Sequence, residues 1–431
     1  MRPIFERLRN NKGVALITTF LVISVLAIFS AAFLTVSINQ KISADIFKRR
    51  TTAFNIAEAG LDNAIVWLRA QSSPPIGNRT NPWGGAQNIG GGSYSVTITD
   101  LGAIGGNGTI RRYRITSTGS FGNMNRVLTN YMQVDNYSRY IWFTNSETYN
   151  GTTVWFWTPD SLNGPTHTNA HFNIYGSPVF AGEAQSADDY IRFYNNGNNI
   201  NLSQLTNLPY DNPNFQQGLT FGVDPITMPA QALNLRSAAS GGGLSLQGNS
   251  TVVLNNDGTM NVTNSSKGWN SQNMSLPANG TLFVNSGTLT LSGTLNGRLT
   301  AGASSNVLIP NNIIYADTKP GSLNMMGIIS ERNVMISSNA PQNLEIDGSV
   351  MALGTSFMLQ NWSVGPPKGT LTVYGGIIQS QRGPVGTFNG RTGQKASGYS
   401  KNYSYDSRLL TNPPPFMPTT GDYITLSWEE D

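Results

Sequence analysis

The sequence contains no cysteine, and only 12% of its 431 residues are charged. The absence of cysteine excludes disulfide bonds, thiolate nucleophiles and cysteine-ligated metal sites. Histidine is also scarce, with two in the whole chain. Glycine is plentiful, at 46 residues, and aromatic residues make up 10%. This composition argues against disorder and favours a β-rich protein whose turns use glycine and asparagine.

The net charge of +4 gives little support to a nucleic-acid partner. Much of the positive charge flanks one apolar segment near the N-terminus, at Arg2, Arg7, Arg9, Lys12, Lys41, Lys48, Arg49 and Arg50. No basic face with interleaved aromatic residues follows this segment. The sequence also lacks a glycine-rich phosphate loop and a Gly-x-Ser-x-Gly turn. We therefore expect neither a nucleic-acid partner nor a cofactor.

The apolar segment is too long for an ordinary secretory signal. No charged residue occurs between Gly13 and Gln40, and a bilayer is crossed by about 20 residues. A secretory signal has an apolar core of about 7–15 residues, followed by small residues at the cleavage site. Here the small residue, Gly13, comes before the apolar run. We expect this helix to stay attached and to anchor the chain in a membrane.

This N-terminus resembles that of type IV prepilins, in which a dedicated peptidase cuts after the glycine of a short basic leader. The resemblance implies a leader over residues 1–13, cleavage between Gly13 and Val14, and a prepilin peptidase as partner. It also implies a single pass through the inner (cytoplasmic) membrane, with the bulk of the chain outside the cytoplasm, in a pilus or pseudopilus at the cell surface. The alternative is a plain single-pass anchor.

One position departs from the pattern of major pilins, which carry glutamate as the fifth residue of the mature chain. Thr18 stands there instead. A carboxylate in an apolar bundle is unfavourable unless it is paired, so its absence indicates a subunit that does not need the pairing. Minor subunits of the GspK and PilX types resemble the chain in this respect. A nearby stretch is similar to PilX-type N-terminal regions and contains Ala57, Glu58, Ala59, Gly60 and Leu61.

The sequence predicts one long helix over residues 14–70, of which residues 14–40 form the transmembrane part. From Val14 onward no proline occurs before Pro74, and the apolar positions beyond the membrane part follow helical spacing. Such a helix would be roughly 85 Å long. A membrane anchor joined to a separate soluble helix is the alternative. Alternating strands at 93–99, 112–116 and 126–134 predict a small antiparallel sheet within residues 71–135, packed on the helix as an α+β pilin-like head.

Residues 136–431 form an all-β domain in this interpretation. Short β-branched or leucine-rich runs recur between Asn-Gly, Ser-Gly and Asn-Asn turns, and several open with Gly-Thr-(Leu/Met). We prefer a β-solenoid (β-helix) from about residue 225, followed by a proline-rich tail, over an irregular sandwich. Over residues 160–425 the chain is similar to an uncharacterised domain attached to PilX-like N-termini. That likeness implies an architecture and no chemistry.

The two histidines, His167 and His171, are candidates for a ligand or metal site. In an extended strand they share a face with Asn169 and Asn173. A metal site needs more ligands, such as Glu183 or Asp188. A hydrogen-bonded strand surface is the other interpretation, and we assign no metal to this chain.

Two further groups have a functional and a structural interpretation. Glu345 and Asp347 project from one strand face and could serve as the acid and base of a glycosidase, or lie on a solvated strand edge. We favour the edge and expect the protein not to be an enzyme.

The aromatic group contains Trp142, Phe143, Trp155, Phe156 and Trp157. These residues could stack on sugars, or they could pack between the head and the β-rich domain. We favour the packing role.

Taken together, these features predict a minor pilin or pseudopilin-like subunit of a type IV pilus or type II secretion-type system. It would pack against other pilin-like subunits through its N-terminal helix and display an adhesive or scaffolding domain, with a surface polysaccharide or protein as ligand. The bulk of that domain favours a tip or priming position. The alternatives are a membrane-anchored carbohydrate-active enzyme on a β-helix and a plain envelope structural protein.

Overall fold

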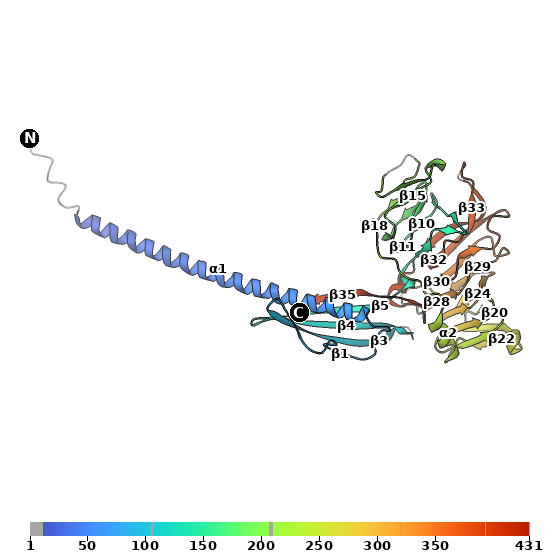
Figure 1. Ribbon diagram of the computed structural model, residues 1–431, viewed down its shortest axis with the longest axis horizontal. Helices are drawn as coiled ribbons and strands as arrows, with labels where there is room; N and C mark the ends of the chain where they lie inside the picture. Colours follow the sequence, from blue (N-terminus) through green and yellow to red (C-terminus); the bar gives the residue numbers. More distant parts are fainter. Residues whose placement is uncertain (1–11, 105–106, 207–209, 320, 393, 431) are drawn as a thin grey trace, which may run out of the picture.

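The computed structural model describes residues 12–104, 107–206, 210–319, 321–392 and 394–430. The predicted leader, residues 1–13, lies almost entirely outside this part of the chain. Figure 1 shows a long helix that projects from a small sheet, with a large β-rich body at the far end of that sheet. The predicted order of a long helix followed by a large β-rich region is therefore confirmed.

Helix α1 (Lys12–Arg69) is a single element of 58 residues, as predicted. Its first half projects away from the rest of the chain (Figure 1) and is apolar on all sides; Phe33, for example, is 76% exposed. Among the described residues, α1 is the one helix long and apolar enough to cross a membrane. A helix that is apolar all round is stable in an apolar environment rather than in water.

The second half of α1 packs on an antiparallel sheet formed by β3 (Gly92–Ile104), β4 (Asn107–Phe121) and β5 (Met124–Asn136). These strands contain the three predicted ones. Two short strands, β1 (Arg79–Thr80) and β2 (Gln87–Ile89), pair with β3. The shared core joins one stripe of the helix to one face of the sheet, and includes Ile56, Ala57, Leu61, Leu68, Val96, Ile98, Tyr113 and Ile115.

The last strand of the chain, β35 (Thr419–Glu430), also belongs to this sheet, where it pairs antiparallel with β5. The sequence interpretation placed residues 136–431 in the β-rich domain and ended them in a proline-rich tail, so it was wrong for this strand. The physical reason lies at the edge of β5, whose backbone groups need partners. The Tyr423 ring also packs edge-on against Tyr113, with 6.0 Å between centroids.

The β-rich body consists mainly of short parallel strands stacked in rows. The first row runs, in spatial order, through β19 (Leu244–Gln247), β23 (Thr281–Asn285), β25 (Arg298–Ala303), β28 (Met325–Ser330), β30 (Leu344–Ala352), β32 (Pro367–Gln381), β6 (Trp142–Ser146), β11 (Thr166–Thr168), β14 (Ala184–Ser186) and β18 (Leu219–Phe221). The long strands β30 and β32 bend from one row into another.

Two further rows flank the first. The second contains β20 (Ser250–Leu254), β24 (Leu289–Leu295), β26 (Val307–Ile309), β29 (Val334–Ile336) and β31 (Phe357–Leu359). The third begins with the second half of β24 and continues through β27 (Ile313–Tyr315), the first parts of β30 and β32, β34 (Lys395–Ser404), β10 (Ser161–Leu162), β13 (Val179–Phe180) and β17 (Asn214–Phe215).

The remaining strands border these rows. A small sheet contains β9 (Phe156–Trp157), β12 (Asn173–Tyr175), β15 (Ile191–Phe193) and β16 (Ile200–Leu202). Antiparallel additions are β21 (Thr259–Asn264) and β22 (Trp269–Ser275) beside β20, β33 (Gly386–Phe388) beside β34, and the hairpin of β7 (Thr148–Tyr149) and β8 (Thr152–Thr153). The described part of the body also contains two short α-helices, α2 (Leu233–Ser240) and α3 (Arg408–Thr411).

The rows do not follow chain order. Residues Ile377 of β32 and Trp142 of β6 are partners in one parallel pairing, so the segment from 142 to 221 stacks beyond β32. In the first row the chain therefore starts in the middle, at β6, and continues to one end, at β18. It resumes at the other end, at β19, and returns to the middle at β32. Parallel rows begin near residue 142 rather than near the predicted 225, because strands of two or three residues carry no alternating pattern. Closure of the rows into a solenoid stays a prediction.

Candidate functional site

A cavity of about 430 Å³ opens on the part of the body where β6 meets β32. It lies between the β7–β8 hairpin, strand β9, the turn at Trp362, and the segment from Gly383 to Tyr403. Its walls are rich in aromatic residues, which include Tyr149, Trp155, Trp157, Trp362, Phe388 and Tyr399. We call it the aromatic cavity. Its volume is within the range of about 300–1,000 Å³ that small-molecule sites occupy.

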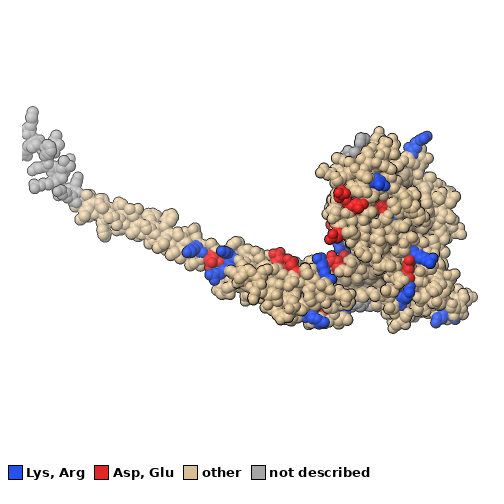
Figure 2. Space-filling model, viewed as in Figure 1, with Lys and Arg blue, Asp and Glu red and all other residues tan. Residues whose placement is uncertain are grey.

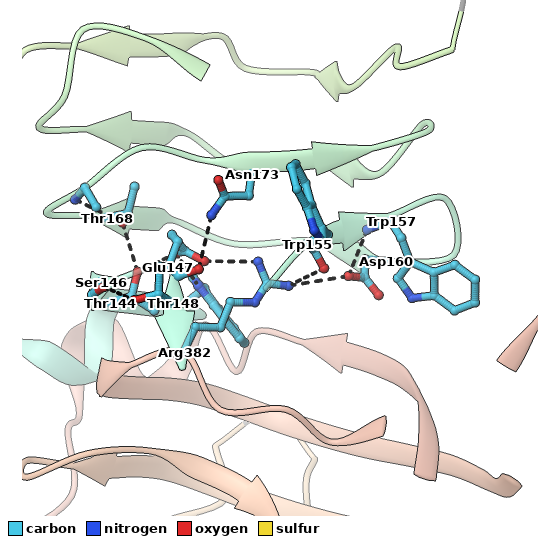
Figure 3. Close-up of polar contacts among 12 residues, drawn as sticks. Thr144, Ser146, Glu147, Thr148, Trp155, Trp157, Asp160, Thr168, Asn173 and Arg382 are labelled. Carbon is cyan, nitrogen blue, oxygen red and sulfur yellow. Dashed lines mark hydrogen bonds and ion pairs between the residues drawn. The ribbon is translucent and has the colours of Figure 1, made fainter. Parts of the chain in front are cut away.

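A buried ion network forms the floor of the aromatic cavity (Figure 3). Arg382 and Glu147 are each 1% exposed, and Nη1 of Arg382 lies 3.0 Å from Oε2 of Glu147. The other terminal nitrogen, Nη2, donates to the carbonyl of Trp155 at 3.0 Å and lies 3.8 Å from Oδ2 of Asp160. That same oxygen of Asp160 is 2.7 Å from Nζ of Lys401. Two carboxylates thus face two cations in the interior.

Further contacts keep the network in place. Glu147 accepts hydrogen bonds from Nε1 of Trp142 at 3.3 Å and from the hydroxyl of Thr144 at 2.5 Å. The guanidinium of Arg382 lies over the ring of Phe156, 3.5 Å from its centroid. Burial lowers the pKa of Lys401, and the neighbouring Asp160 opposes that effect. Buried charges are tolerated only when they are paired, so the network fixes β32, β6 and β34 together.

The cavity presents cations and no carboxylate. Arg382, Lys395 and Lys401 are among its lining residues, whereas no aspartate or glutamate is. The Nζ of Lys395 donates to the carbonyls of Lys368 and Gly369 and to the hydroxyl of Ser400. Within the described part of the chain, no carboxylate lies within 4.0 Å of it. The charged residues that line the cavity are therefore all cationic, and Lys395 is the one among them without a paired carboxylate in the described part of the chain.

The β7–β8 hairpin forms one rim of the aromatic cavity. Its turn places Asn150 and Gly151 at positive φ, 47° and 77°, the geometry of a tight two-residue hairpin turn. The side chains of Tyr149, Asn150 and Thr152 line the cavity and have no hydrogen-bond partner among the described residues. The rim thus offers a phenol, an amide and a hydroxyl to a ligand.

The residues of the predicted aromatic group divide between the interior of the body and the wall of the cavity. Trp142, Phe143 and Phe156 are buried. Phe143 belongs to the junction between the head and the body, together with Tyr137 and Tyr140, in agreement with the favoured prediction. The half-buried Trp155 and Trp157 instead line the aromatic cavity; the ring of Trp157 stacks on Phe388 at 4.9 Å.

The two histidines do not share a ligand-binding face. His167 is buried, and its ring nitrogens contact Oε1 of Gln185 at 3.3 Å and Oδ1 of Asn169 at 2.8 Å. Burial lowers the pKa of His167. Strand β11 ends at Thr168, so His171 lies outside it and pairs with Asp188 at 2.8 Å. Among the residues described, no group of three or more His, Cys, Asp or Glu could hold a metal.

The predicted carboxylate pair is split by burial. Glu345 is exposed on β30, but Asp347 is only 3% exposed. Its Oδ2 accepts the backbone N–H of Tyr315 at 2.8 Å, while Oδ1 has no partner. The charges of Asp406 and Arg408, from the C-terminal segment, act on it. The prediction of a solvated strand edge is therefore wrong for Asp347, which the folded chain covers.

The residues of the predicted anchor and motif occupy one helix. Gly13 and Val14 lie exposed at the start of α1. Thr18 donates its hydroxyl to the carbonyls of Val14 and Ala15, both at 3.0 Å, so its hydrogen bonding is satisfied within the helix.

The PilX-like motif lies where the helix meets the sheet. Ala57, Gly60 and Leu61 are buried there, whereas Glu58 is exposed and Ala59 half-buried. A Cβ on Gly60 would lie 2.3 Å from Oγ of Ser117. Strand β4 contributes a matching glycine, because a Cβ on Gly119 would lie 2.3 Å from the carbonyl oxygen of Ala53. The small residues of the motif allow close helix–sheet contact.

Sequence reasoning missed Glu147, Arg382, Trp362 and Lys395. The first two lie 235 residues apart, and no local pattern connects them. The available signal was their rarity, since isolated charges are uncommon among the aromatic and β-branched runs of this region.

Residues 94–188 match the model of a family described as a domain of unknown function, DUF4900. This match runs from the head sheet into the first strands of the body and includes Glu147 and Asp160. No curated protein matches the chain. Among solved structures, the competence-associated pilin ComZ from Thermus thermophilus is similar, with 11% identity, a TM-score of 0.34, and coverage of 89% of this chain and 98% of that one. A likeness this weak does not establish a shared fold.

Proposed function

We propose that this protein is a minor pilin-like subunit, anchored by the first half of α1, that displays its β-rich body outside the cytoplasm. The observation that carries this proposal is the division of α1. One uninterrupted helix has an apolar first half that is exposed within the described part of the chain and a second half packed on an antiparallel sheet. The apolar half suits a bilayer before assembly and neighbouring helices after it.

Thr18 supports a minor rather than a major position. A glutamate at this place would need a cationic partner in the apolar bundle, whereas the hydroxyl of Thr18 is satisfied by its own helix. The subunit would then pack laterally with other pilin-like subunits without a specific charge pair. Its partners in this proposal are those subunits, a prepilin peptidase and the inner membrane.

The size and place of the body support a tip or priming position. In Figures 1 and 2 the body lies at the end of the head that is opposite to the projecting helix, and it is much broader than the head. Repeated at every subunit, so broad a domain would crowd its neighbours along a filament. A place at the end of the filament avoids this conflict.

The parallel rows support a scaffolding or adhesive role for the body. Side chains from the stacked strands form one continuous apolar core that reaches from Trp142 to Tyr403. We infer that the rows wrap around this core as a solenoid, in which each strand is hydrogen-bonded to those above and below it. Such a stack is a stiff support for surface sites.

Mass spectrometry of the membrane-extracted protein tests the anchor. We expect a mature N-terminus at Val14 in a host that has a prepilin peptidase, and an uncut chain for the variant Gly13→Leu. The control is a host without the peptidase. An intact Met1 in the wild type, or a cut after Ala32, would contradict the proposal.

Co-purification tests the assembly step. Wild-type protein should be recovered in sheared surface filaments, in far lower amount than the major subunit. The Gly13→Leu variant should remain in the membrane fraction. Recovery of both proteins in the membrane fraction alone would favour a plain envelope structural protein instead.

A further inference from the structure

We propose that the aromatic cavity binds a sugar residue that carries a carboxylate, as part of a surface polysaccharide. This inference deepens the proposed function, because a ligand of this kind is met only by a domain displayed outside the cytoplasm. It rests on three independent features of the cavity: its aromatic walls, its free polar rim and its positive charge.

The aromatic walls suit the apolar faces of a pyranose ring. Trp155 and Trp157 line the cavity from one segment and Trp362 from another, and all three are half-buried. Half-buried tryptophan combines a large apolar surface with a polar N–H group that remains available at the edge. Walls on several sides allow a ring to be enclosed rather than merely laid on a surface.

The rim suits the hydroxyl groups of the same ring. Tyr149, Asn150 and Thr152 reach the cavity from the β7–β8 hairpin, and their side chains have no hydrogen-bond partner within the described part of the chain. A phenol, an amide and a hydroxyl together supply donors and acceptors. A purely apolar ligand would leave these groups unpaired, so the rim favours a ligand with many hydroxyls.

The charge of the cavity selects an acidic sugar. Glu147 and Asp160 pair with Arg382 and Lys401 from behind the lining, so their cationic partners face the cavity and the carboxylates do not. Lys395 also lines the cavity, where its charge has no carboxylate within ion-pair distance among the described residues. The three N–H groups of Lys395 donate to two carbonyls and to the hydroxyl of Ser400, so a carboxylate of the ligand would balance its charge by taking the place of the Ser400 hydroxyl. Arg382 acts as a positioning residue, since its hydrogen bonds hold the carbonyl of Trp155.

Isothermal titration of the full-length protein tests this assignment. The detergent is an alkyl amine oxide, which has no sugar headgroup that could compete. The probes are trimers of galacturonic, glucuronic and mannuronic acid, each compared with its methyl ester, which keeps the ring and removes the charge. We expect saturable binding of at least one acid, at least tenfold weaker binding of its ester, and weaker binding of the acid at high salt.

Three variants locate the site. Trp362→Ala removes one wall, and Lys395→Gln removes the charge while keeping a hydrogen-bond donor; each should weaken binding of the acid at least tenfold. Trp428→Ala is the matched control, because Trp428 is 48% exposed on the head sheet, and it should bind as the wild type does. Trp362→Phe should restore most of the affinity lost in Trp362→Ala.

Several results would overturn the inference. These are no binding of any of the three acids by the wild type, equal binding of acid and ester, or unchanged binding by folded Trp362→Ala and Lys395→Gln. The comparison of acid with ester needs no variant, so it holds even if a substitution prevents folding. Mass spectrometry of the same preparations reports the N-terminus at Val14 separately, and so distinguishes failure of the cavity from failure of the pilin-like anchor.

Discussion

Arg382 and Glu147 form an ion pair of 3.0 Å in which each side chain is 1% exposed, although 235 residues separate them in the sequence. The pair connects the end of β32 to the loop that follows β6, and so lies where two parts of the first row that are far apart in the sequence meet. The pair also forms part of the floor of the aromatic cavity. Its integrity therefore affects both the fold of the body and the shape of the site.

Glu147→Gln should destabilise the body strongly. Removing one partner of a buried pair leaves an uncompensated charge and costs about 3–5 kcal/mol. Urea unfolding followed by tryptophan fluorescence should show a lower midpoint, and the double variant Glu147→Gln/Arg382→Met should recover much of the loss. Asp422→Asn is the control: Asp422 is 52% exposed in its pair with Arg69, and such pairs contribute about 0–1 kcal/mol. Equal effects of the two single substitutions would contradict the prediction.

Gly119→Ala should separate α1 from the head sheet. A Cβ at this position would lie 2.3 Å from the carbonyl oxygen of Ala53 and 2.4 Å from the amide nitrogen of Ala57. Both are backbone atoms of the helix and cannot rotate away. We expect a loss of about 1–3 kcal/mol, typical of overpacking, measured as faster hydrogen exchange in β4 and in the second half of α1. Ser120→Ala, on the neighbouring half-exposed residue, should leave exchange unchanged.

The stability of the body should fall as the pH rises towards neutrality, because of Asp347. Burial raises the pKa of Asp347 from its ordinary 3.8 to about 7, with Glu345 and Asp406 acting in the same direction and the Tyr315 N–H opposing them. A carboxyl group with a raised folded-state pKa holds its proton more tightly in the folded state. Its ionisation therefore leaves the free energy of unfolding unchanged below about pH 4 and lowers it increasingly between about pH 4 and 7. The full loss is reached above about pH 7.

The variant Asp347→Asn isolates this effect. It cannot ionise, and its side-chain oxygen can still accept the N–H of Tyr315. The difference in unfolding midpoint, variant minus wild type, should be larger at pH 8 than at pH 5. Glu345→Gln, at an exposed neighbouring position, should show a much smaller pH-dependent difference. A constant difference between Asp347→Asn and the wild type from pH 4 to 8 would contradict the assignment.

The elements with a regular apolar pattern could be predicted from the sequence. Helix α1 has no proline and one continuous stripe, and β3, β4 and β5 alternate over many residues, so their types and places were foreseen. The stacking order of the body could not be foreseen. The pairing of Ile377 with Trp142 is long-range, and strands such as β10 and β13 have two residues each, too few to show any period.

The candidate site was foreseen only in part. Trp155 and Trp157 belonged to a conspicuous aromatic group, and one of its two interpretations was sugar binding. The other walls come from the turn at Trp362 and from β33 and β34, more than 200 residues away along the chain. A cavity assembled from such distant segments depends on the row order, which no local pattern specifies. Glu345 is exposed whereas Asp347 is buried, and this difference likewise depends on where the C-terminal segment folds back.

Deleting β35, by ending the chain at Pro418, should make the head sheet self-associate. Strand β5 would become an edge with unpaired backbone groups, which readily pair with another chain, and Tyr113 would lose its contact with Tyr423. Size-exclusion chromatography with light scattering in detergent should show dimers or larger species for the truncated chain. The control is Glu429→Gln/Glu430→Gln, which keeps the strand and its backbone pairing with β5 and should remain monomeric. A monomeric truncated chain with a protected β5 in hydrogen exchange would show that the sheet does not need its C-terminal strand.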